Sequence, residues 1–296
     1  MNFSASGKLL LFGEYLVLRG ALCLAIPLRF GQKMSVSRQE AEGIRWIARA
    51  EETIWFSATF SKDLNVIQSS NSDKAEAIRD LLIFLKTKNT AILDSGLNIE
   101  TQTNFPIEWG FGTSSTLVSL LSKWSEIDPY IILKNSFGGS GYDVACANAD
   151  HPILYKTAGG VIESVELAKA VTSQTLFIFS GKKQATTPEV ERFNTLEITA
   201  DRIEKMNQII STAVTTSEIE TFENAMNASE ALLSEILNRP TIKEENFADY
   251  PFAIKSLGAW GGDFFMATYR SEDDARSYFN ELGYDIQFTY DELIKE

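Results

Sequence analysis

Apolar and polar residues alternate along residues 34–60, most clearly around Trp46 and across residues 54–56. A period of two sends successive side chains to opposite faces of a strand, so this stretch predicts strands of an antiparallel sheet. Turns are expected near residues 42–43 and 50–52, where glycine or acidic residues interrupt the alternation.

Two further patterns flank this predicted sheet. Residues 74–85 carry apolar side chains at helical spacing and predict an amphipathic helix, and residues 97–103 alternate again and predict a strand. Near the N-terminus, residues 6–28 contain two apolar runs on either side of Gly13-Glu14-Tyr15, which predicts two strands joined by a turn.

The charged residues of this first stretch have simple interpretations. Lys8 lies at the mouth of the first strand, where an exposed strand-end lysine is expected, and a solvent-facing Glu14 in the turn would be unremarkable. Glu14 and Arg19 interrupt the apolar run too early for a secretory signal or a membrane span. Since no later stretch reaches about 18 apolar residues, we expect a soluble, cytoplasmic protein.

The C-terminal part of the chain follows a different order of elements. The pattern predicts strands at 176–179, 253–257, 264–269 and 285–290 and helices at 188–214, 217–237 and 272–282. This β-α-α-β-β-α-β order is typical of a split α/β sandwich with helices on one face. We therefore expect two domains, residues 1–168 and residues 169–296.

Composition excludes several classes of function. The 296 residues include 27 basic and 40 acidic side chains, and the net charge of −13 argues against a nucleic-acid binder or a binder of anionic membranes. An anionic substrate would need a local basic pocket. Cys23 and Cys146 are too few for a disulfide framework, and His151 is the only histidine, which excludes histidine triads and paired-histidine metal sites.

The most informative stretch runs from Pro106 to Ser115. Gly110 and Gly112, one residue apart, allow a sharp turn and a close approach to a ligand, and hydroxyl residues and an apolar helical run follow. Such a turn at a helix N-terminus points backbone N–H groups and the positive end of the helix dipole at one place, which suits phosphate. The candidate nucleotide-binding residues are Gly110, Phe111, Gly112, Thr113, Ser114 and Ser115. Taken alone, these residues fit a plain capped helix equally well.

A second glycine-rich turn surrounds one carboxylate. Gly138, Gly139 and Gly141 lie close to Asp143, just before a small apolar segment. This arrangement holds a carboxylate at a fixed place on a tight backbone, although a surface turn explains it equally well.

Three segments together resemble the motifs of the GHMP kinases. Residues 7–18 are similar to the first motif, Pro106–Ser115 to the phosphate loop, and Gly258–Asp263 to the glycine-rich third motif. Within the family, Ser140–Asp143 and the closing Asp263 resemble the phosphomevalonate kinase branch most. The resemblance implies an α+β fold of two domains. These are an N-terminal mixed α/β domain and a C-terminal ferredoxin-like split α/β sandwich, with the active site between them.

The resemblance also implies a reaction and roles for single residues. It implies an ATP-dependent kinase that uses Mg²⁺ and phosphorylates a small molecule. The favoured acceptor is 5-phosphomevalonate, and the alternatives are mevalonate and other small alcohols. Asp143 would accept the proton of the attacking oxygen or hold it by a hydrogen bond, Lys8 would keep Asp143 ionised and help neutralise the transferring group, and Ser114 would bind Mg²⁺. The implied acceptor-binding residues are Glu14, Tyr15, Ser140, Gly141, Lys182, Ala259 and Gly261. The implied enzyme is a monomer or homodimer with no nucleic-acid or membrane partner.

Departures from the family pattern leave other functions open. Phe111 replaces a leucine, Ser115 an alanine and Trp260 a glycine, and Trp260 would either cover the cleft or pack between domains. Ile132 stands where many relatives place a glutamate ligand of Mg²⁺. The alternatives are therefore a ligand-binding homologue without turnover and a decarboxylating relative, although Gly112 argues against the latter.

Overall fold

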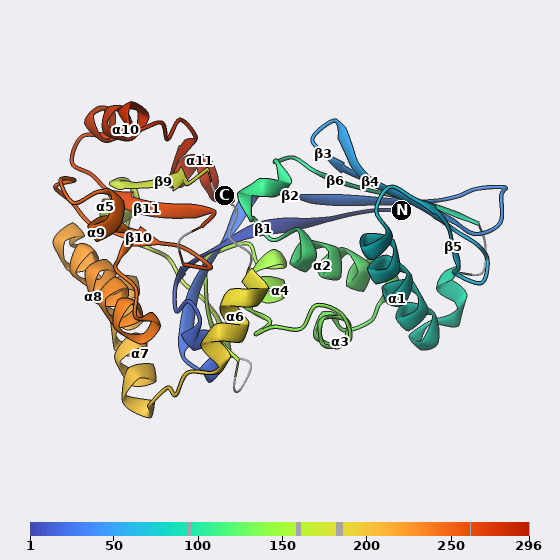
Figure 1. Ribbon diagram of the computed structural model, residues 1–296, viewed down its shortest axis with the longest axis horizontal. Coiled ribbons are helices and arrows are strands. Elements are labelled where there is room, and N and C mark those ends of the chain that lie inside the picture. The colour runs from blue at the N-terminus through green and yellow to red at the C-terminus, as the bar shows by residue number, and fades with distance from the viewer. Residues whose placement is uncertain (94–95, 158–160, 182–185, 261, 296) are drawn as a thin grey trace. The chain divides into compact units, whose positions relative to one another are not determined.

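A computed structural model describes residues 1–93, 96–157, 161–181, 186–260 and 262–295 (Figure 1). The chain forms two compact units, and each is assembled from several segments. The first unit comprises Met1–Gly7, Phe30–Ile107 and Phe111–Asn148, and the second comprises Lys8–Arg29, Glu108–Gly110 and Ala149–Glu296. Strands β1 (Asn2–Phe12) and β2 (Leu22–Arg38) contribute to both units. The boundary between residues 168 and 169 stays a prediction.

The first unit contains the strands that the alternating pattern predicts. They are β3 (Ile44–Ala50), β4 (Thr53–Phe60), β5 (Val66–Ser69) and β6 (Leu97–Thr103), arranged in the order β5-β4-β3-β6-β2, with β1 paired to β2. The β3–β6 pair is parallel and differs from the expected antiparallel sheet. The reason lies in the connection, because β4, β5 and a helix lie between β3 and β6 and return the chain beside β3 in the same direction.

Helices α1 (Ser72–Lys88) and α2 (Thr113–Ser125) lie on one face of this sheet (Figure 1). The side chain of Asn71 caps α1 by accepting from the Lys74 amide at 3.0 Å, and Asp128 caps the short α3 (Pro129–Lys134) in the same way. The remaining short elements are α4 (Tyr142–Ala147), η2 (Thr90–Leu93) and η3 (Ile107–Trp109). The core between helices and sheet includes Trp46, Phe60, Leu82, Val118 and Ile132.

The second unit contains two groups of strands. The first half of β2 follows η1 (Leu16–Arg19) and pairs with β7 (Ile153–Lys156), which pairs with β8 (Val161–Ser164). Four strands, β9 (Thr175–Phe179), β10 (Ile254–Ser256), β11 (Phe264–Thr268) and β12 (Gln287–Thr289), form an antiparallel sheet in the order β10-β11-β9-β12. Because its first strand lies between the third and the fourth, this is the predicted ferredoxin-like arrangement.

The second unit has more helices than the sequence predicts. They are α5 (Lys169–Thr172), α6 (Thr186–Asn194), α7 (Ala200–Thr215), α8 (Ile219–Leu237), α9 (Ile242–Asn246), α10 (Glu272–Glu281) and α11 (Tyr290–Leu293). The single helix predicted over residues 188–214 is wrong, since α6 and α7 are separate. Thr195 bonds back to the Arg192 carbonyl at 2.8 Å, and Thr199 caps α7, so local hydroxyl bonds compete with a continuous helix.

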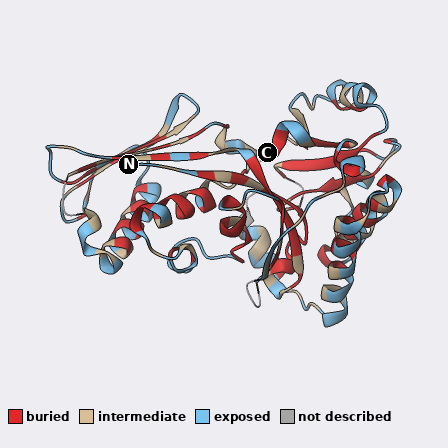
Figure 2. Ribbon diagram, turned by 180° about the vertical axis from the view of Figure 1, so that it is seen from behind, coloured by how far each residue is buried: buried red, intermediate tan, exposed pale blue. Residues whose placement is uncertain are grey.

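Helices cover both sides of the four-stranded sheet, which corrects the predicted one-faced sandwich. Helices α7 and α8 lie on one side and α10 on the other (Figure 1). On the α10 side, Phe265 packs with Phe247 and Phe279 in a core of aromatic residues. Strands β9 and β11 are buried along nearly their whole length (Figure 2).

Candidate functional site

The phosphate loop ends in a helix N-terminus of the predicted kind. Gly112 caps α2 with φ +89°, a left-handed conformation that favours glycine. The Ser115 hydroxyl donates to the Gly112 carbonyl at 2.8 Å, and the Thr116 hydroxyl donates to Gln32 Oε1 at 2.7 Å. These bonds fix the first turn of α2, while Thr113 is half-buried and Ser114 is exposed. The first turn can therefore present backbone N–H groups and the Ser114 hydroxyl to an anion.

The first motif contacts this loop within the first unit. A Cβ on Gly7 would lie 2.8 Å from the Phe30 carbonyl oxygen and 3.0 Å from that of Phe111, so only glycine allows so close an approach. The candidate catalytic Lys8 is the residue that follows Gly7 in β1.

Helix α4 carries Asp143 and packs on the helix of the phosphate loop. Gly141 caps α4 with φ +88°, and Asp143 is half-buried in the first turn, while Ser140 and Gly141 are buried. The Asn148 side chain donates to the Ser119 hydroxyl at 3.1 Å and joins α4 to α2. The first unit thus holds the helix that follows the phosphate loop and the candidate catalytic carboxylate on two packed helices. The pairing of Asp143 with Lys8, which belongs to the second unit, stays a prediction.

In the second unit, Glu14 is buried rather than solvent-facing. Its carboxylate pairs with the ammonium group of Lys255 on β10, and both side chains are 0% exposed. Burial raises the pKa of Glu14, and the neighbouring Lys255 opposes that rise. Lys255 also donates to the Ser256 carbonyl at 2.9 Å. Glu14, a candidate for binding the acceptor substrate, therefore forms an ion pair with Lys255. The sequence analysis did not identify Lys255.

Tyr15, the next candidate acceptor residue, is also buried. Its ring centroid lies 5.2 Å from that of Phe193, and its backbone has φ +58°, which is uncommon for a residue with a side chain. Burial, with a smaller effect from Glu189, raises the pKa of Tyr15 to about 12. The phenol is therefore neutral at physiological pH.

Glu230, a residue that the sequence analysis did not identify, forms hydrogen bonds to the third motif and to the strand before it. The indole N–H of Trp260 donates to Glu230 Oε1 at 2.9 Å, and the Ser256 amide donates to the same oxygen at 3.1 Å. Trp260 is 4% exposed, so it is a packing residue of the second unit. Ala259 is half-buried, whereas the candidate residues Lys182 and Gly261 lie outside the described residues.

The end of the third motif lies against the start of the phosphate loop. A Cβ on Gly110 would collide with the carboxylate of Asp263. The Asp263 carbonyl accepts from the Ser180 amide at 2.7 Å, and the neighbouring Trp109 ring lies 5.3 Å from that of Phe288. The second unit therefore brings two of the three sequence motifs into contact.

Among the comparisons with known proteins, only the comparison with solved structures finds matches. No protein-family model and no curated protein matches the sequence. A Streptococcus pneumoniae phosphomevalonate kinase in complex with phosphomevalonate and AMPPNP matches with a TM-score of 0.71 at 17% identity, covering 98% of this chain and 99% of that one. A Methanococcus jannaschii mevalonate kinase matches at 0.68 and 16% identity, covering 100% of this chain and 98% of that one. A Lactococcus lactis galactokinase complexed with galactose matches at 0.66 and 14% identity, covering 100% and 93%.

The chain has the fold of the GHMP kinases. The GHMP-kinase fold spans nearly the whole chain, as the resemblance of the three motifs predicts. No helix in the described part of the chain is long and apolar enough to cross a membrane.

Two departures from the GHMP-kinase pattern are explained by packing. The Phe111 ring is fully buried between Phe30 and Phe105, with centroid distances of 5.6 and 5.4 Å, so only its backbone can face a ligand. Ile132 is likewise 0% exposed, and its side chain packs in the core of the first unit.

Alternative magnesium ligands in this region are limited. Asp128 accepts from the Tyr130 amide at 2.7 Å as the cap of α3, whereas Glu126 is exposed at the C-terminal end of α2. Among the described residues, no group of three or more histidine, cysteine, aspartate or glutamate side chains could hold a metal ion. Mg²⁺ prefers oxygen ligands and keeps several waters, so the exposed Ser114 hydroxyl fits a site completed by nucleotide phosphates.

Proposed function

We propose that this protein is an ATP-dependent kinase that phosphorylates a small molecule, with 5-phosphomevalonate as the acceptor. The observation that carries the proposal is the packing of the Asp143 helix on the helix whose N-terminus forms the phosphate loop. The close approach of Gly7 to Phe111 adds the first motif to the same place. The likeness of the whole fold to three kinds of GHMP kinase supports the reaction class.

The proposed chemistry is a direct transfer between oxygens. An oxygen of the acceptor's phosphate attacks the γ-phosphorus, the bond from the γ-phosphorus to the β–γ bridging oxygen breaks, and ADP leaves with that oxygen, so the acceptor becomes a diphosphate. Asp143 takes the proton that the acceptor's phosphate carries as a monoanion, and the N-terminus of α2 with Lys8 offsets negative charge on the transferring group. Mg²⁺, held by Ser114 and the nucleotide, supplies further charge neutralisation when bound. Most of the catalytic effect in such a site comes from positioning.

Two segments favour 5-phosphomevalonate over other acceptors. The Ser140–Asp143 and Gly262-Asp263 segments resemble the phosphomevalonate kinase branch, and the Streptococcus pneumoniae neighbour is a phosphomevalonate kinase in complex with that compound. The acceptor phosphate needs cations, and Arg192 is exposed on α6, where its guanidinium donates to the Leu237 carbonyl at 3.4 Å. Lys182 and Lys183, the other candidate cations, lie outside the described residues.

A ligand-binding homologue without turnover is the second candidate function. It is favoured by the buried Ile132, which stands where many relatives place a glutamate, and by Trp260 in the third motif. A homologue of this kind would bind nucleotide or acceptor but release no ADP.

Phosphorus-31 NMR of the purified protein with ATP and Mg²⁺ separates these functions. Mevalonate, 5-phosphomevalonate and galactose are tested as acceptors in parallel, with ATP alone as the control. We expect ADP and a diphosphate doublet with 5-phosphomevalonate. Faster turnover of mevalonate would overturn the choice of acceptor, and nucleotide binding without transfer to any acceptor would favour the ligand-binding homologue.

A further inference from the structure

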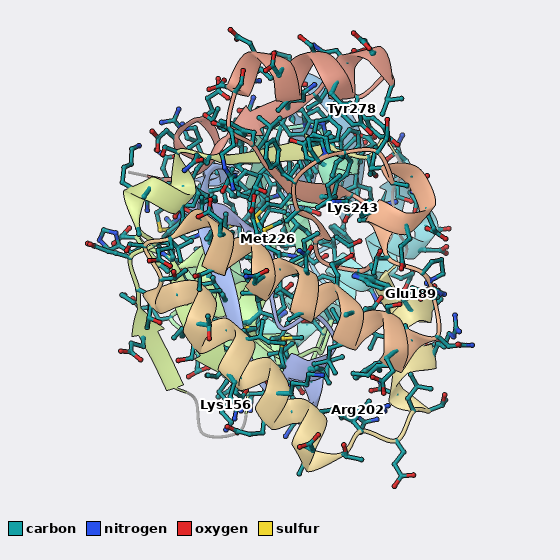
Figure 3. The ribbon with its side chains drawn as sticks, turned by 90° about the vertical axis from the view of Figure 1, so that its left-hand side faces the viewer. Lys156, Glu189, Arg202, Met226, Lys243 and Tyr278 are labelled. Atoms are coloured by element: carbon teal, nitrogen blue, oxygen red, sulfur yellow. The ribbon has the colours of Figure 1, made fainter. Side chains whose placement is uncertain are left out.

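Glu230 lies in the middle of α8, yet it is almost completely buried at 2% exposure. Figure 3 looks onto α7 and α8 and labels Met226, one turn before Glu230 on the same helix. One carboxylate oxygen of Glu230 accepts two hydrogen bonds, from the indole of Trp260 and from the backbone amide of Ser256. A single side chain thus holds both ends of the segment from Ser256 to Trp260.

The other end of the third motif is fixed by the backbone. The Leu257 amide donates to the Phe264 carbonyl at 3.1 Å, and the Asp263 carbonyl accepts from the Ser180 amide. Asp263 is the third residue after Trp260, so at most about 11 Å of chain joins the two. Asp263 in turn lies against Gly110 of the phosphate loop.

We propose that Glu230 is a positioning residue of the third motif, which anchors Trp260 and thereby fixes Asp263 against Gly110. Only the consequences of this role for kinetics and nucleotide binding rest on the proposed kinase function. The hydrogen bond between Glu230 and Trp260 also explains how the third motif accommodates a tryptophan at position 260, where the family pattern has a glycine. A buried indole N–H needs an acceptor, and Glu230 supplies one from a rigid helix.

Charged groups on several elements face Glu230. Lys255 on β10 and Glu14 after β1 act on it through space, and Lys243 and Glu244 on α9 line a cavity of about 360 Å³ beside it. Burial raises the pKa of Glu230 to about 7, and Lys255 opposes that rise. An ionised carboxylate accepts stronger hydrogen bonds than a neutral one. The hold on Trp260 should therefore tighten as the pH rises through about 7.

Fluorine NMR of protein labelled with 5-fluorotryptophan tests the anchor without any assay of activity. The chain has five tryptophans, and a Trp260→Phe variant assigns the Trp260 resonance. We expect this resonance to titrate near pH 7 in the wild type. It should stop titrating in Glu230→Gln, whose amide oxygen can still accept both bonds, and shift at every pH in Glu230→Ala. Glu235→Gln, on the same helix but 64% exposed, is the matched control and should leave the resonance unchanged.

Kinetics and nucleotide binding test whether the anchor positions the site. We expect Glu230→Ala to lower kcat/KM for ATP by about 10- to 100-fold, the effect of a small misplacement, and Glu230→Gln to stay within about 3-fold of wild type below pH 7, where Glu230 is mostly protonated. AMPPNP binding should weaken in parallel. An unchanged Trp260 resonance in Glu230→Ala, or a shifted resonance with unchanged AMPPNP affinity, would overturn the proposal. Absence of phosphoryl transfer by the wild type would instead overturn the proposed function, because the fluorine measurement does not depend on it.

Discussion

The ammonium group of Lys255 donates to the carboxylate of Glu14 in a part of the second unit where neither side chain reaches solvent. The pair joins the turn of the first motif to β10, the strand that leads into the third motif. Removing charges from water costs several kcal/mol, and the attraction between them repays that cost only while both partners remain.

Removal of one partner should therefore destabilise the protein strongly. We expect Lys255→Met or Glu14→Gln to lower the free energy of unfolding by about 3–5 kcal/mol, since each leaves a buried group without its counter-charge. The double variant should recover part of that loss. Urea unfolding measures the effect, with Lys169→Ala as the control. Lys169 pairs with Asp291, but the two side chains are 71% and 67% exposed, so we expect a loss of at most about 1 kcal/mol. Equal losses at both pairs would contradict the buried ion pair.

The raised pKa of Glu230 predicts how stability depends on pH. A folded-state pKa of about 7, above the ordinary 4.5, means that the folded protein binds the proton more tightly than the unfolded chain. Proton binding at Glu230 therefore adds about 3 kcal/mol to the free energy of unfolding. This stabilisation is fully present below pH 4.5 and is lost as the pH rises through about 7. Urea unfolding between pH 5 and 8 should show the wild type losing stability relative to Glu230→Gln. If the free energy of unfolding changed with pH in the same way in both proteins, the raised pKa of Glu230 would be contradicted.

Gly110 and Gly138 form a matched pair for the contact between the phosphate loop and the third motif. Both have positive φ, +69° and +66°, but a Cβ meets the Asp263 carboxylate at Gly110 and open space at Gly138. Alanine at either place should cost about 1–2 kcal/mol in backbone strain. Thermal and urea unfolding should show a clearly larger loss for Gly110→Ala. Equal losses in the two variants would mean that Asp263 moves away freely.

Metal dependence tests the role of the Ser114 hydroxyl. With Ile132 buried where relatives place a glutamate, Ser114 is the main candidate protein ligand. We expect Ser114→Ala to raise the Mg²⁺ concentration for half-maximal activity, and Asp128→Asn, which can still cap α3, to leave it unchanged. Glu126→Gln is titrated in parallel. A normal Mg²⁺ requirement in Ser114→Ala with a large shift in either carboxylate variant would point to a relocated acid.

Local patterns predicted the elements well because each depends on nearby residues. Alternation predicted β3, β4 and β6, and the helical spacing over residues 74–85 predicted α1. The break between α6 and α7 was missed because the apolar spacing continues across residues where hydroxyl bonds end the helix.

Charged residues of the second unit were the main omission in the candidate site. Sequence alone assigns glutamate and lysine to the surface by default, because partners far apart in the chain leave no local pattern. Glu14 and Lys255 are 241 residues apart, and Glu230 reaches Trp260 across 30 residues. The signal that was available is Lys255 itself, a single charge within the otherwise uncharged strand segment 253–257.

The most direct test of the proposed kinase is the rate of phosphoryl transfer to 5-phosphomevalonate by the wild type and by Asp143→Asn. Asp143 is proposed to act on the attacking oxygen and not on the nucleotide, so the substitution should lower kcat by at least about 100-fold while the Kd for ATP stays within about 3-fold. A kcat near that of the wild type in Asp143→Asn would contradict the account.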